Sequence, residues 1–513
     1  MEYKNIPVEK LKIAVRNEKI ADKKLDTKPV GYFKDAFIRF KKNKSSVAAA
    51  VIILILFLYA FIVPFISDYD VTFRDGYYKQ VLPKNNLFVG TGFWDGCTEK
   101  NESQAGYDYY NSIGQEFGSS AVKKVKDVTV DVNTGDTVYT IDIDSYDKVG
   151  FVYADLSQEE YDALKHYQNV TGKQVMYPIP DNYKTQYNAV NGANLWYKLA
   201  NDKPTTDGAS AFHAEDGTPI YEHNYKTSKN PEFGKYDSIR LASDNGGENG
   251  EEWYCYAIKN QTGYKVRVHY KEYYVYKNGF EPSHLFGTNQ HGQDIFACLA
   301  NGARLSFILA ISVSAINFLI GIVYGCVEGY YGGAIDLLLE RVRDVLNSVP
   351  FIVVATLFQL HLAKRVGPVV SLLFAFVLTG WIGIAGRVRT QFYRFKGSEY
   401  VLAARTLGAS DKRLIFRHIL PNSLGTIITS TVLIIPGVIF TESMLSYLGI
   451  VDLETSGLTS IGTMLSGGQA FLATYPHIIL FPALFISLLE ISFNMFGNGL
   501  RDAFNPSLRG ADE

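Results

Sequence analysis

The 513-residue sequence has few cysteines and no excess of charge of either sign. Its four cysteines are Cys97, Cys255, Cys298 and Cys326, and no C-x-x-C or other metal-ligand spacing occurs. The chain carries 50 Lys and Arg against 52 Asp and Glu, a net charge of −2. Composition therefore gives no indication of a metal-binding module, and no bulk positive field that would attract nucleic acid.

Sequence motifs of several enzyme classes are missing as well. No G-x-x-x-x-G-K-[ST] loop occurs, so this chain cannot bind ATP phosphates by that route. No H-E-x-x-H zinc motif and no G-x-S-x-G nucleophile motif occur either. We therefore expect a chain that is not an enzyme, with no catalytic residue, no metal ligand and no cofactor of its own.

Long apolar runs decide the class of protein. Residues 47–66 form an almost wholly apolar run of roughly 20 residues, enough to cross about 30 Å of bilayer core. A signal peptide is the alternative interpretation, but the polar segment before the run is too long and no small-residue cleavage site follows. Five later apolar runs, at 306–327, 349–362, 369–384, 424–448 and 477–496, are also predicted to cross the membrane. With the run at 47–66, the sequence predicts six transmembrane helices.

Charge distribution gives the expected orientation. Basic residues just before residue 47 keep segment 1–46 in the cytoplasm by the positive-inside rule. Six crossings then return the tail 501–513 to the cytoplasm and place 449–476 outside. Lys364 and Arg365 would lie outside, against the rule. We expect a multi-pass plasma-membrane protein whose two termini are both cytoplasmic.

Residues 67–300 are predicted to form an extracellular α+β domain inserted after the first span. Alternating apolar residues on either side of 133–136 indicate a hairpin, and Ser157 with Glu160 forms a capping-box pattern before a helix near 159–168. Alternation in the segment 266–276 suggests further strands. A Cys97–Cys255 disulfide is left open, because sequence does not show that the two thiols are close.

Tyrosine clusters in this region have two interpretations. They could bind sugar or peptide, or they could pack in the core and on half-buried strand faces, which fits tyrosine better. The residues concerned are Tyr107, Tyr109, Tyr110, Tyr270, Tyr273 and Tyr274.

A basic segment, 399–421, lies between two apolar runs and has the pattern of a helix–glycine–helix elbow. Apolar residues recur at Tyr400, Ala403, Ala404 and Leu407, one face of a short helix that Ser398 can cap and Gly408 ends. Ser410 or Asp411 can cap a second helix, and Pro421 follows its last turn, which holds Arg417 and His418. A basic loop that only fixes topology is the alternative interpretation.

The sequence of this elbow resembles the motifs of a known protein family. E-Y-V-x-A-A-R-x-L-G-A-S and R-H-I-L-P-N resemble the EAA loop of ABC-importer permeases, and more narrowly the oligopeptide/dipeptide (OppC/DppC-like) branch. Residues 284–510 share further segments, although Asn289 and Gln293 replace the Asp and Arg of the family's G-T-D-x-x-G-R-D. The resemblance implies a MetI-like permease core at 301–500, with coupling loop 396–421. In that family the loop docks on an ATPase, which here implicates Glu399, Ala403, Ala404, Arg405, Gly408, Arg417 and Pro421.

The same resemblance implies a transport system with several partners. It implies an OppB-like second permease, two cytoplasmic ATPases (OppD/OppF-like) that bind ATP and Mg, an OppA-like extracellular lipoprotein and a short-peptide substrate. Peptide length, or another solute such as a nickel complex, stays open. A membrane-anchored receptor with an extracellular ligand-binding domain is the alternative function. The insertion would serve as a docking surface for the binding protein or as inert decoration.

Polar residues recur along the predicted spans. A carboxylate at membrane depth normally faces a bundle interior or a water-filled cavity. Glu442 is therefore predicted to line or gate the substrate path, and a helix–helix hydrogen bond is the equally weighted alternative. The candidate path residues are Glu442, Ser443, Asn317 and Gln359.

Overall fold

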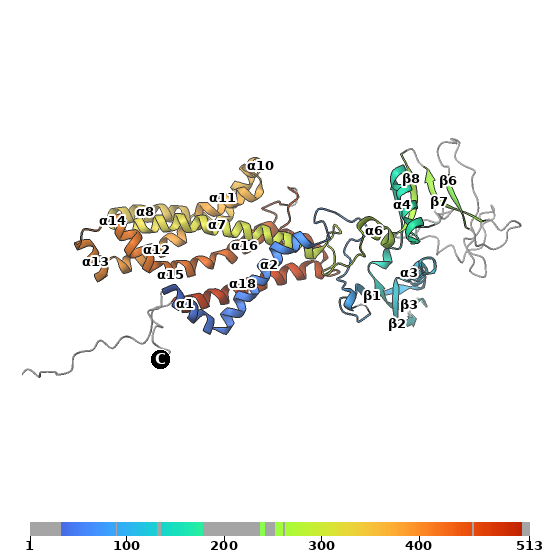
Figure 1. The fold of residues 1–513 in the computed structure, drawn as a ribbon, viewed down its shortest axis with the longest axis horizontal. Helices are drawn as coiled ribbons and strands as arrows, with labels where there is room; N and C mark the ends of the chain where they lie inside the picture. Colours follow the sequence, from blue (N-terminus) through green and yellow to red (C-terminus); the bar gives the residue numbers. More distant parts are fainter. Residues whose placement is uncertain are drawn as a thin grey trace, which may run out of the picture.

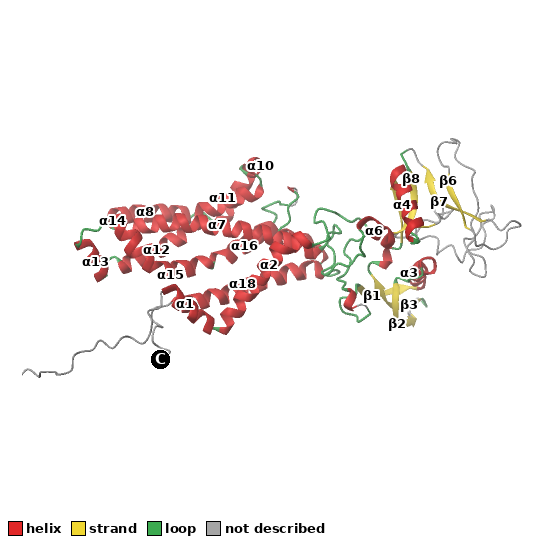
Figure 2. Ribbon diagram, in the orientation of Figure 1, coloured by secondary structure: helices red, strands yellow, loops and turns green. Residues whose placement is uncertain are grey.

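The computed structural model describes residues 32–88, 90–130, 135–177, 236–241, 252–259, 262–453 and 456–504. The molecule is elongated, with a helical bundle at one end and a region of strands and short helices at the other (Figures 1 and 2). Most of the predicted cytoplasmic segment 1–46 and of the tail 501–513 lies outside the described residues.

The bundle is built from helices that precede and follow the insertion. Its elements are α1 (Tyr32–Lys42), α2 (Lys44–Ile66), α7 (Ile295–Tyr331), α8 (Gly333–Asn347), α9 (Phe351–His361), α10 (Ala363–Val366), α11 (Pro368–Gly380), α12 (Ile382–Phe395), α13 (Glu399–Thr406), α14 (Asp411–Arg413), the π-helical turn η5 (Leu414–Ile419), α15 (Leu420–Val432), α16 (Ile434–Tyr447), α17 (Ile461–Gly468) and α18 (His477–Phe504). Because α7 begins at Ile295, where Asp294 caps it by accepting from the Ala297 N–H (2.7 Å), the core starts slightly before the predicted residue 301.

Five helical stretches of the described chain are long and apolar enough to cross a membrane. They are Lys44–Ile66, Ile295–Tyr331, Pro368–Phe395, Asp411–Tyr447 and His477–Phe504. The predicted span at 349–362 corresponds to α9, which has only 11 residues and is bent by 71° from α8. Pro350 lies at this break, as expected for a residue that cannot continue a helix. The described residues therefore contain five candidate spans, or six if α8 and α9 count as one.

Small residues let α7 and α12 approach each other closely. Gly321, Gly325 and Gly329 recur every four residues along α7 and face α12. A Cβ atom at Gly321 would lie 2.7 Å from the Ile384 side chain, too close for a real contact. Small residues at this spacing are typical of close helix packing in membranes.

The insertion contains two antiparallel sheets. One has the order β1-β3-β2 and the other β4-β8-β7-β6, with β5 added on β8. The strands are β1 (Cys97–Ser103), β2 (Val122–Val130), β3 (Thr137–Asp144), β4 (Phe151–Leu156), β5 (Met176–Tyr177), β6 (Tyr236–Leu241), β7 (Glu252–Lys259) and β8 (Tyr264–His269), and the main helices are α3 (Gln104–Phe117), α4 (Gln158–Thr171) and α6 (Tyr270–Asn278).

Two local predictions in the insertion are confirmed. Ser157 and Glu160 form the predicted capping box, and α4 follows it. β2 and β3 pair as an antiparallel hairpin, although residues 133 and 134 of the predicted turn lie outside the described residues.

The predicted strand through residues 270–276 is wrong, because β8 ends at His269 and α6 begins at Tyr270. Tyr270, Tyr273 and Tyr274 lie at i, i+3 and i+4, so a helix turns all three toward the core, where they are buried. Tyr107 stacks on Tyr139 with ring centroids 4.4 Å apart. These side chains therefore serve packing, whereas the side chain of Tyr109 lies outside the described part.

Cys97 carries a free thiol, so the structure does not contain the disulfide that the sequence left open. Cys97 lies in β1 of one sheet, whereas Cys255 lies in β7 of the other sheet. Burial raises the pKa of the Cys97 thiol to about 12, which keeps it protonated and unreactive at neutral pH.

Candidate functional site

The elbow around Gly408 lies at the end of the bundle opposite to the insertion (Figure 1). α13 ends in a Schellman motif: the Ala409 N–H donates to the Ala404 carbonyl (3.1 Å), and the Gly408 N–H donates to that of Arg405 (3.0 Å). Gly408 has a φ of +83°, a backbone conformation that residues other than glycine rarely adopt. The sharp turn between the two helices thus depends on this glycine.

The apolar residues of α13 divide between two sides. Val401 is buried and Ala404 packs beside it against α12 and α7, whereas Leu407 is 88% exposed. Tyr400 and Ala403 are exposed as well. Tyr400, Ala403, Ala404 and Leu407 share one side of this helical turn, as their spacing predicts. Most of that side is exposed, because Val401 directs a different side of the helix toward the bundle.

The predicted caps and basic residues lie where the sequence places them. Ser398 and Ser410 occupy the N-cap positions of α13 and α14, but neither side chain makes the capping hydrogen bond. Glu399 is in the first turn of α13, near the positive end of its dipole. Arg405 and Arg417 are both exposed, so the elbow presents positive charge on its surface.

Pro421 does not end the second helix as predicted. The chain continues through η5 directly into α15, where Pro421 occupies the first turn. The Leu420 N–H bonds to the Ile415 carbonyl, five residues back. This wider π turn accommodates a proline that lacks an N–H and would clash with an ordinary helical turn.

Two polar contacts attach the elbow to the end of α7, and a third joins that end of α7 to the end of α12. The Tyr330 hydroxyl donates to Asp411 Oδ1 (2.5 Å), and Arg405 Nη2 lies 3.4 Å from the Tyr330 hydroxyl oxygen. Lys396 Nζ donates to the Gly329 carbonyl (3.1 Å). The elbow is therefore joined directly to α7 and, through α7, to the end of α12.

An ion-pair network supports these contacts from inside the bundle. Arg389 binds Asp336 through two hydrogen bonds of 2.6 and 2.8 Å, and Arg343 binds the buried Glu328 at 2.7 Å. The Tyr393 hydroxyl donates to Asp336 Oδ2 (2.6 Å). Sequence reasoning missed Arg389 and Glu328; the available signal was a pair of charged residues at the ends of long apolar runs.

Glu442 is buried in a cage of hydroxyl groups between α16 and α7. It accepts hydrogen bonds from Ser306 (2.8 Å), Ser446 (3.1 Å) and Ser443 (3.5 Å). This geometry matches the helix–helix hydrogen bond that was the alternative to a path role.

The other two candidate path residues bond elsewhere in the bundle. Asn317 Nδ2 donates to the Phe376 carbonyl (3.3 Å), which joins α7 to α11. Gln359 Nε2 donates to the Pro368 carbonyl (3.0 Å), which joins α9 to the start of α11. The four candidates therefore do not converge on one site in this chain.

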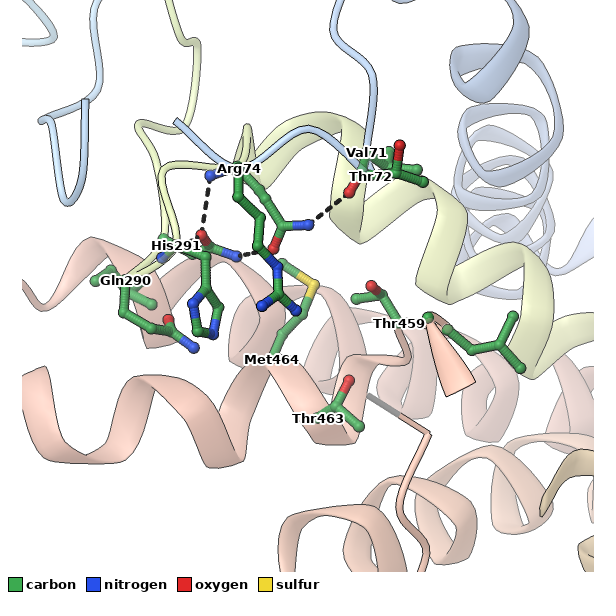
Figure 3. Close-up of a pocket in the computed structure, with 13 residues that line it drawn as sticks. Val71, Thr72, Arg74, Gln290, His291, Thr459, Thr463 and Met464 are labelled. Carbon is green, nitrogen blue, oxygen red and sulfur yellow. Dashed lines mark hydrogen bonds between the residues drawn. The ribbon is translucent and has the colours of Figure 1, made fainter. Parts of the chain in front are cut away.

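A cavity of about 120 Å³ lies instead where the insertion meets the bundle (Figure 3). Arg74, His291 and Thr463 are among the residues that line it. Asn289 Nδ2 donates to Gln293 Oε1 (3.0 Å) beside this cavity. The family's Asp–Arg pair is thus replaced by a neutral amide pair.

Known proteins resemble this chain over two separate parts. Residues 317–510 match the family described as "Binding-protein-dependent transport system inner membrane component". Residues 31–87 match the "N-terminal TM domain of oligopeptide transport permease C".

Curated relatives show the same relationship. The "Oligopeptide transport system permease protein OppC" of Bacillus subtilis is 41% identical over 226 residues, which cover 44% of this chain and 72% of the relative. The "Dipeptide transport system permease protein DppC" of the same organism is 40% identical over 227 residues, 44% of this chain and 69% of the relative. The OppC protein of Escherichia coli is 35% identical over 230 residues, 45% of this chain and 74% of the relative.

Among solved structures, an inward-facing MetNI methionine ABC transporter matches with a TM-score of 0.33 and 15% identity over 40% of this chain and 96% of its own. Taken with the elbow and its apolar helices, the sequence matches show that this chain belongs to the family of binding-protein-dependent transport system inner membrane components, among permeases of the OppC/DppC type.

Proposed function

We propose that this chain is a transmembrane subunit of an ATP-driven importer of short peptides, and that its elbow couples transport to ATPase partners. The observation that carries the proposal is the exposed α13, with its slim Ala403 and uncovered Leu407 at the end of the bundle. An apolar, basic helix of this kind suits insertion into a cleft of another protein. The relatives are named as peptide-transport permeases, and none is named as a receptor.

The proposed partners are those that the family resemblance implies, and the missing phosphate-binding loop assigns ATP binding by that route to other chains. Two cytoplasmic ATPases of the OppD/OppF type would bind ATP and Mg, while an OppB-like permease completes the path and an OppA-like lipoprotein delivers the peptide. Glu399, Ala403, Ala404, Arg405, Gly408, Arg417 and Pro421 are the proposed coupling residues. Closure of the ATPases would move α13 and, through Tyr330 and Lys396, the ends of α7 and α12.

The proposed topology keeps both termini in the cytoplasm and puts the α+β insertion outside. It follows from the basic residues before α2 and from the position of α13 and the insertion at opposite ends of the bundle (Figure 1). We propose that the insertion, residues 67–300, forms a docking surface for the binding protein.

We also propose that the candidate path residues act by fixing the helices that enclose the path. Glu442 and Ser443 would hold α16 to α7, while Asn317 and Gln359 would hold α11 to its neighbours. In this proposal the four side chains influence transport through helix position.

Co-purification of the intact complex tests the function directly. We expect mass analysis to find nucleotide-binding subunits and bound peptides with the chain, and uptake of labelled peptide to stop when those ATPases carry an inactivating substitution. A chain that purifies without ATPases, or uptake that survives their inactivation, would contradict the importer proposal.

A further inference from the structure

A hairpin in the insertion presents apolar side chains on its surface. Its arms meet at Lys84 and Asp95, which form an isolated antiparallel bridge, and the Asn85 N–H donates to the Trp94 carbonyl (2.8 Å). We call residues 85–88 and 90–94 the aromatic hairpin. Val89, between them in the sequence, lies outside the described residues. The stretch 85–94 reads N-N-L-F-V-G-T-G-F-W and contains no charged residue.

The described tip of the aromatic hairpin is apolar and uncovered. Leu87 is 86% exposed and Phe93 is 63% exposed. Phe88, also exposed, packs edge-to-face on Phe93 with ring centroids 6.0 Å apart. A cluster of exposed apolar side chains that contact one another marks a surface that binds something apolar.

Several backbone groups of the same tip bond to other atoms of the hairpin or to the adjacent Asp95. The side-chain oxygen of Asn85 accepts from the Leu87 N–H (3.0 Å), and the Asn85 backbone carbonyl accepts from the Phe88 N–H (2.9 Å). Asp95 Oδ2 accepts from the Gly92 N–H (2.9 Å), and the Thr91 hydroxyl donates to the Phe88 carbonyl (2.7 Å). Such a loop can leave water at low cost, because few backbone groups would lose a hydrogen-bond partner.

Trp94 places the hairpin against a membrane span. Its ring lies nearly parallel to those of Phe286 and Phe481, at 11° and 8°, with centroids 6.4 and 6.1 Å apart. Phe481 belongs to α18, five residues into a helix that is long and apolar enough to cross the membrane. Leu480 and Leu484, on the same turns of α18, are exposed. The aromatic hairpin therefore lies beside the first turns of a helix that is long and apolar enough to cross a membrane.

We propose that the aromatic hairpin is a membrane anchor that inserts Leu87, Phe88 and Phe93 into the interfacial layer of the bilayer, with Trp94 at its boundary. Tryptophan is enriched at this depth, and an uncharged tip has no ionic group to dehydrate there. The anchor would fix the height and tilt of the insertion above the membrane. The leaflet is the outer one if the proposed topology holds.

Spin labels measure the depth of the tip. Nitroxides would be attached to Leu87→Cys and Phe93→Cys in the full chain, with the four native cysteines replaced by alanine, in nanodiscs of phosphatidylcholine and phosphatidylglycerol. Val170→Cys is the matched control, an exposed apolar residue of α4 in the same insertion. We expect the ratio of collisions with oxygen to collisions with a water-soluble nickel chelate to be severalfold higher at positions 87 and 93 than at 170.

Two results would overturn the anchor. A ratio at positions 87 and 93 equal to that at 170 would place the hairpin in water. Protection from both reagents would mean that a protein surface, not lipid, covers the tip. The ratio does not depend on which side the insertion occupies or on transport, so its failure is distinguishable from failure of the importer proposal.

Discussion

The two ends of the bundle differ in what covers them. At the elbow, Leu407 and Tyr400 are left exposed, and α13 turns on a glycine with few polar anchors. At the other end the chain covers itself: the Thr288 N–H donates to the Val81 carbonyl (3.0 Å), and the Lys84 N–H to that of His284 (2.9 Å). The first and last segments of the insertion are thus hydrogen-bonded to each other at its base.

This difference indicates where a partner is needed. Burying an exposed apolar side chain stabilises a complex by roughly 25 cal/mol per Å², and the elbow still has such area to bury. At the base of the insertion, the exposed apolar area lies in the aromatic hairpin, for which we propose lipid as the partner. The elbow end is accordingly the end at which we expect the ATPases to bind, and the following predictions test that contrast.

Loss of uptake at the elbow is the largest expected effect. Ala403→Asp and Gly408→Asp should abolish peptide uptake, because a charge would enter the proposed ATPase cleft, while membrane insertion stays normal. Gly408→Asn is the matched control for charge, since Asn and Asp both tolerate a positive φ. Ala403→Ser keeps a slim side chain and should keep most uptake. Normal uptake in the two Asp variants would contradict the docking role.

Arg389→Ala should give the next largest effect, on stability. The change leaves the buried carboxyl groups of Glu328 and Asp336 without this partner, which costs about 3–5 kcal/mol when a buried pair is broken. Thermal unfolding of the purified chain measures this loss of stability. Arg389→Lys keeps the positive charge but not the paired hydrogen bonds to Asp336, so it should lose less stability than Arg389→Ala. An unchanged melting temperature in Arg389→Ala would show that the network does not support the elbow end.

Acid should weaken the insertion end selectively. Burial lowers the pKa of His269 to about 3 from its ordinary 6.5, and the ring stacks on Phe117. In the unfolded chain, His269 therefore binds a proton below about pH 6.5. In the folded chain, it binds that proton only below about pH 3. This contribution to stability is complete above pH 6.5 and is lost as pH falls toward 3, by about 2 kcal/mol at pH 5.

His269→Phe removes the titrating ring and should flatten this pH dependence. Thermal unfolding between pH 5 and 7 compares the two chains. A slope that persists in His269→Phe would assign the acid sensitivity to another group.

Glu442→Gln should have the smallest effect. The amide oxygen can still accept from Ser306, and hydroxyl groups can rotate to accept from the new N–H₂, so we expect a change in stability within about 1 kcal/mol. Uptake and its pH dependence should be retained. Altered pH dependence in a complex that still assembles would instead support the path role predicted from the sequence.

Local pattern predicted the elbow but not its orientation. The spacing of apolar residues and Gly408 gave the two helices and the turn between them. Periodicity shows which residues share a face, but not that Val401 would direct the helix inward and leave Leu407 outside. Pro421 was read as an end because the π turn that accommodates it is not visible in the letters.

Long-range contacts were beyond reach of the sequence for a similar reason. Arg389 pairs with Asp336 across 53 positions, and Glu442 meets Ser306 across 136. Nothing in either local pattern specifies such a partner. In the insertion, alternation continued past His269 in the sequence although the chain turns into a helix there, because tyrosine is compatible with both structures.

Crosslinking from the elbow tests the central claim most directly. A photo-crosslinking residue in place of Leu407 should capture an ATPase subunit in the purified complex, whereas the same residue in place of Val170, at the insertion end, should not. The account predicts a Leu407 product that contains the nucleotide-binding chain. If the ATPases co-purify and position 407 crosslinks only to this chain or to lipid, the elbow is not their docking site.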